Sequence, residues 1–344
     1  MRSKKPARQT KQKRDDPWVR ALCLILSSLL PMSGQEQSPE EMGRTKPSVV
    51  RVGPAGWSYP DWKGYVYPER RVKGFHEVEY LAQFFDTVEI NSSFYSPIRP
   101  EHARLWIERV AANPHFLFTA KLWQRFTHER IIPGKGSAAD EKEVRGGFEV
   151  LRTAGKLGAV LLQFPFSFHC TSETRAYLEA LLGRFDDYPL VVEVRHATWN
   201  VPEVFELLRG HGAGFCNIDQ PLIGRSIRPS AETTAPVGYV RLHGRRYDTW
   251  FTEDAEVPAH ERYNYLYSSG ELRPWAERVG RVAEGASEVY VITNNHYQGK
   301  AVVNALELIA MLKKSKVKVP DPLRERFPEL ERIASEPAEA PRLF

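Results

Sequence analysis

Residues 190–194 read LVVEV, and this stretch decides the fold of the chain. Four of its five side chains are apolar, whereas a strand with one face in water alternates apolar and polar residues. Residues 160–162, VLL, have the same character. Strands that are covered on both faces are typical of parallel sheets flanked by helices. The two stretches therefore predict an α/β protein.

Outward from these stretches, short runs rich in β-branched residues alternate with segments of helical period. The predicted strands cover residues 49–57, 87–94, 116–122, 159–164, 190–195, 214–219, 238–243 and 288–294. The predicted helices cover residues 75–85, 101–112, 140–157, 173–184, 202–211, 272–284 and 300–313. Eight such units in about 270 residues predict a (β/α)8 TIM-type barrel. A doubly wound open sheet is the alternative, because periodicity does not show whether a sheet closes.

Two connections depart from a regular barrel. Residues 220–236, between the sixth and seventh strands, contain three prolines and no apolar stripe, so their helix is predicted to be short or missing. Residues 245–275, after the seventh strand, carry seven aromatic side chains. This long, aromatic-rich insertion is expected either to fold over the mouth of the barrel as a lid or to pack against its flank.

The charge of the chain is unevenly distributed. The net charge of +5 lies entirely in residues 1–46, which hold ten basic and five acidic side chains. The other residues hold 38 of each sign, so nucleic acid is a possible partner but is not indicated for the barrel. The three cysteines are far apart and form no CxxC motif, which argues against a disulfide framework and against a cysteine zinc site.

The chain divides into three parts. We interpret residues 1–46 as a disordered or mis-assigned N-terminal extension, residues 47–315 as the barrel domain and residues 316–344 as a C-terminal tail. The apolar run at 21–30 is too short to span a bilayer. Together with the basic stretch before it, this run also resembles a secretory signal, which is the alternative interpretation, although Asp15 and Asp16 interrupt the basic region. We therefore expect a cytoplasmic protein without a membrane partner, whose first 41 residues are dispensable for folding. The oligomeric state stays open.

The chain contains no P-loop, no GxGxxG after the first strand and no HExxH, so we expect neither a cofactor nor a metal. In a barrel of this kind the chemistry takes place at the carboxyl ends of the strands. The candidate site residues at those ends are Trp57, Tyr59, Glu89, Asn91, Tyr95, Lys121, Gln163, Glu193, Arg195, His196, Asp219, Arg241, His243, Asn294, Asn295 and His296.

These candidates allow two interpretations. Burying an ionisable side chain inside an apolar strand costs folding free energy unless the charge is paired or binds a ligand. These residues therefore form either a structural lattice of ion pairs or a ligand site. The aromatic members, Trp57, Tyr59 and Tyr95, are suited either to stacking on a sugar or base or to packing. A polar cluster at one end of a barrel is where a ligand is expected.

Seven strings in the chain resemble the YecE-like family, known as domain of unknown function 72. They are residues 56–59 (GWSY), 89–95 (EINSSFY), Lys121 with 127–128 (TH), 161–165 (LLQFP), 192–196 (VEVRH), 241–244 (RLHG) and 294–296 (NNH). The resemblance runs from about residue 49 to 312 and implies a (β/α)8 barrel. It implies no settled activity. Ser96 stands where the family usually has Arg, so one anion contact is in doubt.

The first functional hypothesis is an enzyme of hydrolase or lyase type that acts on a small anionic or sugar-containing substrate. Glu89 and Glu193 are its acid/base candidates. Lys121, Arg195 and His243 complete the predicted catalytic set, and the other candidates are expected to bind the substrate.

Two other classes of function remain. One is a metal-dependent phosphodiesterase with ligands Glu89, Glu193, Asp219, His243 and His296. It is disfavoured because neighbouring lysine and arginine side chains would already satisfy the carboxylates. The other is a binding protein without catalysis that holds a nucleic acid or a metabolite.

The loops after the last two strands predict an anion site. Residues 243–245 and 295–300 contain glycines that let the backbone approach a ligand, and a helix is predicted to begin near Lys300. Arg241 is expected to add a charge-assisted contact. The alternative is that these polar groups satisfy one another.

Overall fold

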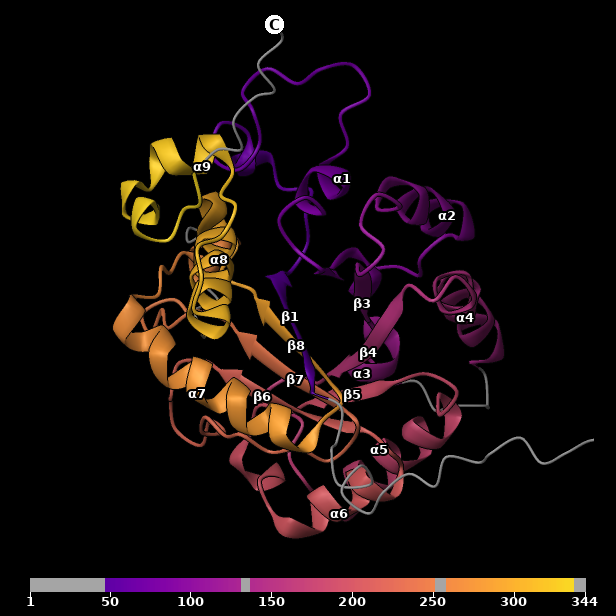
Figure 1. Cartoon of the computed structure of the whole chain (residues 1–344). Coiled ribbons are helices and arrows are strands. Elements are labelled where there is room, and N and C mark those ends of the chain that lie inside the picture. The colour runs from indigo at the N-terminus through magenta and orange to yellow at the C-terminus, as the bar shows by residue number, and fades with distance from the viewer. Residues whose placement is uncertain (1–46, 131–136, 251–257, 337–344) are drawn as a thin grey trace, which may run out of the picture. The chain divides into compact units, whose positions relative to one another are not determined.

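The computed structural model describes residues 47–130, 137–250 and 258–336, so the predictions for residues 1–46 lie outside the described residues. Eight parallel strands form one curved sheet (Figure 1). The strands are β1 (Val49–Pro54), β2 (Thr87–Ile90), β3 (Leu117–Lys121), β4 (Leu157–Gln163), β5 (Leu190–Glu193), β6 (Gly214–Asp219), β7 (Val237–Leu242) and β8 (Glu288–Thr293). Their order is β1-β8-β7-β6-β5-β4-β3-β2. This is the predicted barrel.

Helices connect most of the strands and lie outside the sheet (Figure 1). They are α1 (Glu77–Leu81), α2 (Pro100–Arg109), α3 (Gln124–Thr127), α4 (Ala138–Thr153), α5 (Ser172–Arg184), α6 (Pro202–Gly210), α7 (Ser269–Gly285), α8 (Lys300–Lys313) and α9 (Asp321–Arg326). Residues 220–236, all of which the structure describes, contain no helix. The prediction of a short or missing helix between strands six and seven is confirmed.

The barrel closes between β1 and β2 at the carboxyl ends of the strands. Ala55 and Glu89 form an isolated parallel bridge, and the Gly56 amide donates to the Glu89 carbonyl at 2.8 Å. Gly53 permits this approach, because a Cβ there would lie 1.9 Å from the Thr87 carbonyl oxygen. The seam thus holds Glu89 beside the mouth.

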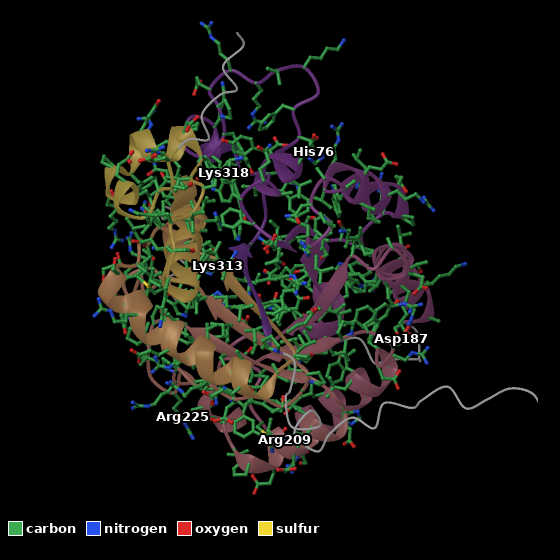
Figure 2. All side chains as sticks on the ribbon, in the orientation of Figure 1. His76, Asp187, Arg209, Arg225, Lys313 and Lys318 are labelled. Carbon is green, nitrogen blue, oxygen red and sulfur yellow. The ribbon has the colours of Figure 1, made fainter. Side chains whose placement is uncertain are left out.

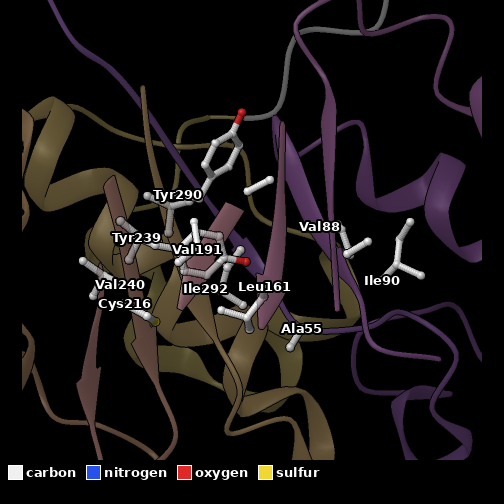
Figure 3. Packing of buried hydrophobic residues seen from close by; sticks show 14 of the residues in the cluster. Ala55, Val88, Ile90, Leu161, Val191, Cys216, Tyr239, Val240, Tyr290 and Ile292 are labelled. Carbon is white, nitrogen blue, oxygen red and sulfur yellow. The ribbon is translucent and has the colours of Figure 1, made fainter. Parts of the chain in front are cut away.

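The interior below the mouth is packed with large side chains. Figure 3 labels Tyr239, Tyr290, Cys216 and Leu161 among the buried residues of this core. The rings of Tyr239 and Tyr290 are 6.0 Å apart, and Gly158 makes room for Tyr290, whose hydroxyl would lie 2.2 Å from a Cβ at that position. These side chains fill the barrel at the amino ends of the strands. A ligand can therefore approach the interior charges from the carboxyl ends of the strands.

The outer surface carries the ordinary charges of the protein, such as Asp187, Arg209 and Lys313 (Figure 2). Among the residues that the structure describes, no helix is both long enough and apolar enough to cross a membrane.

The described part of the insertion 245–275 packs over the mouth. The Trp250 ring lies 5.6 Å from the Arg195 guanidinium carbon, and the Tyr263 ring lies 4.8 Å from that of His296. Tyr267 is buried, and Trp275 belongs to α7. Trp250 and Tyr263 of the insertion thus serve as walls of the barrel mouth.

Residues 316–336, which the sequence assigns to a tail, carry α9 and a 3-10 helix over Pro328–Arg332. Leu323 and Leu330 are fully buried, and Val317 pairs with Ala334 in a parallel bridge. These residues therefore pack on the domain. Burial of each leucine stabilises the folded state by roughly 1.5–3 kcal/mol, which favours this packing.

Candidate functional site

Arg241 on β7 holds the centre of the barrel mouth. Its guanidinium donates to Glu89 Oε1 at 2.8 Å and to Glu193 Oε2 at 2.5 Å, and it also reaches Gln163 Oε1 at 3.0 Å. Arg241, Glu89 and Glu193 are fully buried. Since β2, β5 and β7 are not neighbours in the sheet, these contacts cross the interior. The planar guanidinium of Arg241 thus connects β2, β5 and β7, and we call this guanidinium with its two carboxylates the Arg241 fork.

A second layer lies under this fork. The Tyr239 hydroxyl donates to Glu89 Oε2 at 3.0 Å and lies 2.8 Å from Thr119 Oγ1. The Cys216 thiol is 4.0 Å from Glu193 Oε2, and burial raises its pKa well above the usual range, so it stays protonated. None of these three residues was a sequence candidate. The sequence did contain a signal for Tyr239 and Thr119. Each precedes an inward-pointing residue, Arg241 or Lys121, by two positions, and side chains two positions apart in a strand point to the same face.

Glu193 is also held by side chains that directly follow β5 and β7. Arg195 donates to Glu193 Oε1 at 2.7 Å, and His243 Nε2 lies 3.2 Å from the same oxygen. Asn294 Nδ2 lies 3.1 Å from His243 Nδ1. Burial would raise the pKa of Glu193, but the charge of Arg241 and its other neighbours hold it well below the usual range. Burial lowers the pKa of His243 to about 3, so the imidazole is neutral.

Lys121 ends β3 and points to the same mouth. Its Nζ lies 3.7 Å from Glu89 Oε1 and 5.5 Å from the centre of the Phe94 ring. The side chain is only 7% exposed. Burial and the charge of Arg241 lower the pKa of Lys121 to about 8.

His128, just after α3, is a further residue that the candidate set omits. Its ring packs edge-on against Phe94 with centres 4.9 Å apart, and its Nδ1 lies 3.0 Å from Thr127 Oγ1. Burial, followed by the charges of Arg195 and Lys121, lowers the pKa of His128 to about 4. The string of residues 127–128 was the signal in the sequence that could have identified it.

The charges at the mouth do not balance. Glu89 and Glu193 supply two negative charges, whereas Lys121, Arg195 and Arg241 supply three positive ones. His128 and His243 are neutral at pH 7. The cluster therefore carries one positive charge in excess, in surroundings where burial makes an uncompensated charge costly.

The aromatic candidates line a separate hollow beside β1 and β2. It has a volume of about 340 Å³, and Trp57, Tyr59, Asn91 and Tyr95 lie in its wall. Asn91 Nδ2 donates to the Tyr59 hydroxyl at 3.2 Å, and Tyr95 is 66% exposed.

His296 connects this hollow with the insertion. The Tyr59 ring stacks on His296 at 4.3 Å, and Tyr263 contacts the same imidazole. Burial lowers the pKa of His296 to about 4, so this imidazole is neutral at pH 7. The hollow is shaped for a flat or ring-like group rather than for a charge.

The loops predicted to bind an anion use their donors internally. Arg245 grips Asp219 with two bonds of 2.8 and 3.0 Å, and the Gly244 amide donates to the Tyr267 hydroxyl. The Gln298 amide donates to Asp61 at 2.6 Å. The excess positive charge at the mouth lies instead with Lys121 and Arg195.

Two further candidates have structural partners. Asn295 donates to the Tyr265 carbonyl at 2.7 Å and to Asn304 at 2.8 Å. His196 Nδ1 lies 2.9 Å from Thr198 Oγ1, where it caps a short 3-10 helix. The structure thus brings eight of the sequence candidates together around the fork: Glu89, Lys121, Gln163, Glu193, Arg195, Arg241, His243 and Asn294.

The model of the protein family of unknown function DUF72 matches residues 51–329 of this chain. The chain belongs to the DUF72 family. The DUF72 protein from Thermotoga maritima, whose crystal structure is known, is 35% identical, with a TM-score of 0.66 over 77% of this chain and 99% of that one. A DUF72 protein from Enterococcus faecalis is 25% identical, with a TM-score of 0.66 over 77% of this chain and 96% of that one. No curated protein matches the chain.

The chemistry available to this DUF72 barrel follows from its donors. In the described parts of the chain, no group of three or more His, Cys, Asp and Glu side chains is arranged to hold a metal. Both Glu89 and Glu193 already accept from arginine. What the mouth offers to a ligand is therefore cationic: the Lys121 ammonium and the partly exposed Arg195 guanidinium.

Proposed function

We propose that this DUF72 protein is an enzyme of hydrolase or lyase type that acts on a small anionic substrate, including sugars with an acidic group, at the mouth of the barrel. One observation carries the proposal: five ionised side chains converge there with an excess of one positive charge. A ligand with one negative group would complete the balance, because buried charges are stable only when they are paired.

The roles divide by what each side chain already contacts. Arg195 is 15% exposed and binds Glu193 through one nitrogen, so the rest of its guanidinium is available for a carboxylate or phosphate. Lys121 provides the second cationic contact. Glu89 lies beside Lys121 and is the acid/base candidate, whereas Glu193 stays ionised and positions the two arginines.

The neutral His243 is a positioning residue at the other side of the site. Its Nε2 lies 3.2 Å from Glu193 Oε1 and 3.4 Å from Arg195, and its Nδ1 faces Asn294. A neutral imidazole can donate from Nε2 to the carboxylate of Glu193 while Nδ1 accepts from the Asn294 amide, so both ring nitrogens are used and His243 orients Glu193 beside Arg195. The hollow beside Tyr59 supports a substrate that carries a ring in addition to its acidic group.

The test is ligand-induced stabilisation. The full chain is melted with increasing inorganic phosphate, pyruvate and a sugar phosphate, and a metabolite extract is screened for compounds that the protein retains. We expect saturable stabilisation that Arg195→Gln weakens about tenfold or more, because a charge-assisted contact to an anion is removed. Retained metabolites are then tested for turnover.

Lys63→Ala is the matched control. Lys63 is half exposed, and among the described residues its ion pair is with Glu69 at 3.1 Å. Its loss therefore changes the surface charge by the same amount without reaching the mouth. Equal stabilisation of wild type, Arg195→Gln and Lys63→Ala would show that anions act non-specifically, and the proposal would fail.

A further inference from the structure

Lys121 is a buried ammonium without a hydrogen bond. Within the residues that the structure describes, its Nζ has one neighbour of opposite charge, Glu89 Oε1, at 3.7 Å, which is beyond hydrogen-bond distance. Lys156, at the other end of the barrel, shows what a structural lysine does instead. Its Nζ donates to the carbonyls of Asn113, Pro114 and Phe116 at 3.4, 3.2 and 3.1 Å.

Glu89 does not need Lys121 as a partner. Its Oε1 accepts from Arg241 at 2.8 Å and its Oε2 from Tyr239 at 3.0 Å, so both oxygens have donors. Lys121 is therefore the member of the cluster whose charge is in excess. A lysine whose charge is destabilised by burial and by a nearby cation has a larger neutral fraction, and the neutral amine is the nucleophilic form.

The surroundings favour attack on a carbonyl carbon. The Phe94 ring provides an apolar wall 5.5 Å from Nζ, which keeps bulk water from that side. Arg195 belongs to the same cluster, because its partner Glu193 is joined through Arg241 to Glu89, the neighbour of Lys121. An anionic group held by Arg195 would place an attached carbonyl near Nζ.

We propose that Lys121 is a catalytic nucleophile that forms an imine with an aldehyde or ketone bearing a carboxylate or phosphate. The inference rests on the proposed function, because it uses the same anion-binding mouth. Of the two reaction types in the proposed function, this inference selects the lyase. An imine withdraws electrons from the neighbouring carbon and so permits cleavage of a bond at that carbon.

The step balances without an oxidant or a reductant. The nitrogen lone pair of the neutral amine forms the C–N bond, and the π electrons of the carbonyl move to its oxygen. A proton then passes from nitrogen to that oxygen and gives the carbinolamine. The ionised Glu89, the nearest carboxylate, then takes the second proton of the nitrogen and passes it to the hydroxyl. The hydroxyl leaves as water with the electrons of its C–O bond, and the electron pair left on nitrogen forms the C=N bond.

Reductive trapping tests the imine. The full chain is incubated with pyruvate or glyceraldehyde 3-phosphate and sodium cyanoborohydride, and the reduced adduct at each lysine is quantified by peptide mass spectrometry. At pH 7 we expect Lys121 to be labelled about tenfold or more faster than Lys63, which is exposed and ordinary. The rate at Lys121 should rise with pH to a midpoint near 8, because Lys121 titrates there.

Two variants separate the proposals. Lys121→Arg keeps the charge but removes the nucleophile, so it should lose the adduct while it melts like wild type and labels normally at Lys63. Arg195→Gln should slow labelling of Lys121 by pyruvate but not by formaldehyde, which has no charge to bind.

Each outcome decides one question. Labelling of Lys121 by pyruvate no faster than of Lys63, in a protein that anions stabilise through Arg195, overturns the imine and leaves the proposed function standing. Fast labelling of Lys121 that is independent of Arg195, with no stabilisation by anions, supports the reactive amine and refutes the anion site.

Discussion

Two sides of the barrel mouth use similar residues for opposite purposes. On the side of β6 and the insertion, Asp219 accepts from Arg245 at 2.8 and 3.0 Å and from Tyr267 at 2.5 Å, so its carboxylate is fully used. On the side of β3, the Lys121 ammonium has no hydrogen bond among the described residues, and its Nζ lies 3.7 Å from Glu89 Oε1. A charged residue at a strand end therefore indicates a site only when its neighbours leave it without a partner.

The largest expected effect comes from removing the Arg241 guanidinium. Arg241→Met should lower the free energy of unfolding by about 3–5 kcal/mol, because Glu89 and Glu193 are left as buried, poorly paired carboxylates. Urea denaturation measures this loss. A variant that unfolds at the urea concentration of wild type would mean that the carboxylates are satisfied without Arg241.

The pH dependence of stability sharpens the contrast for Lys121. Its pKa is about 8 when folded and near 10.5 when unfolded, so the unfolded chain binds more protons between these values. Stability relative to Lys121→Met should therefore be lowest below pH 8 and increase by roughly 3 kcal/mol as the pH rises to 10.5. Urea denaturation of both proteins across this range gives the difference. A constant difference would mean that the folded state does not perturb Lys121.

A smaller effect is expected on the saturated side. Asp219→Asn should cost about 1–2 kcal/mol, because the charge that holds Arg245 is removed while Arg245 itself can reach water. Thermal melting gives the cost, and anion titration of the same variant tests the comparison. Phosphate affinity should be unchanged. A marked loss of affinity would place Asp219 in the ligand site and remove the distinction between the two sides.

The sequence alone was enough to predict the barrel, because the consecutive apolar residues of 190–194 require cover on both faces of the strand, and eight such units leave few other folds. It also placed Glu193, Arg195 and Arg241 at strand ends. Tyr239 and Thr119 were predictable in principle from alternation, but nothing in the sequence shows that their hydroxyl groups are needed under Glu89.

Only the tertiary structure decided which charges are paired. Arg241 and Glu89 are 152 residues apart, and their contact exists because Gly53 lets β1 approach β2 and close the barrel. The same closure directs Arg241 and Tyr239 onto Glu89 and leaves the Lys121 ammonium without a hydrogen bond to any residue that the structure describes. Pairing depends on distances of a few ångströms across the interior, whereas hydrophobic periodicity along the chain reports only which elements are covered.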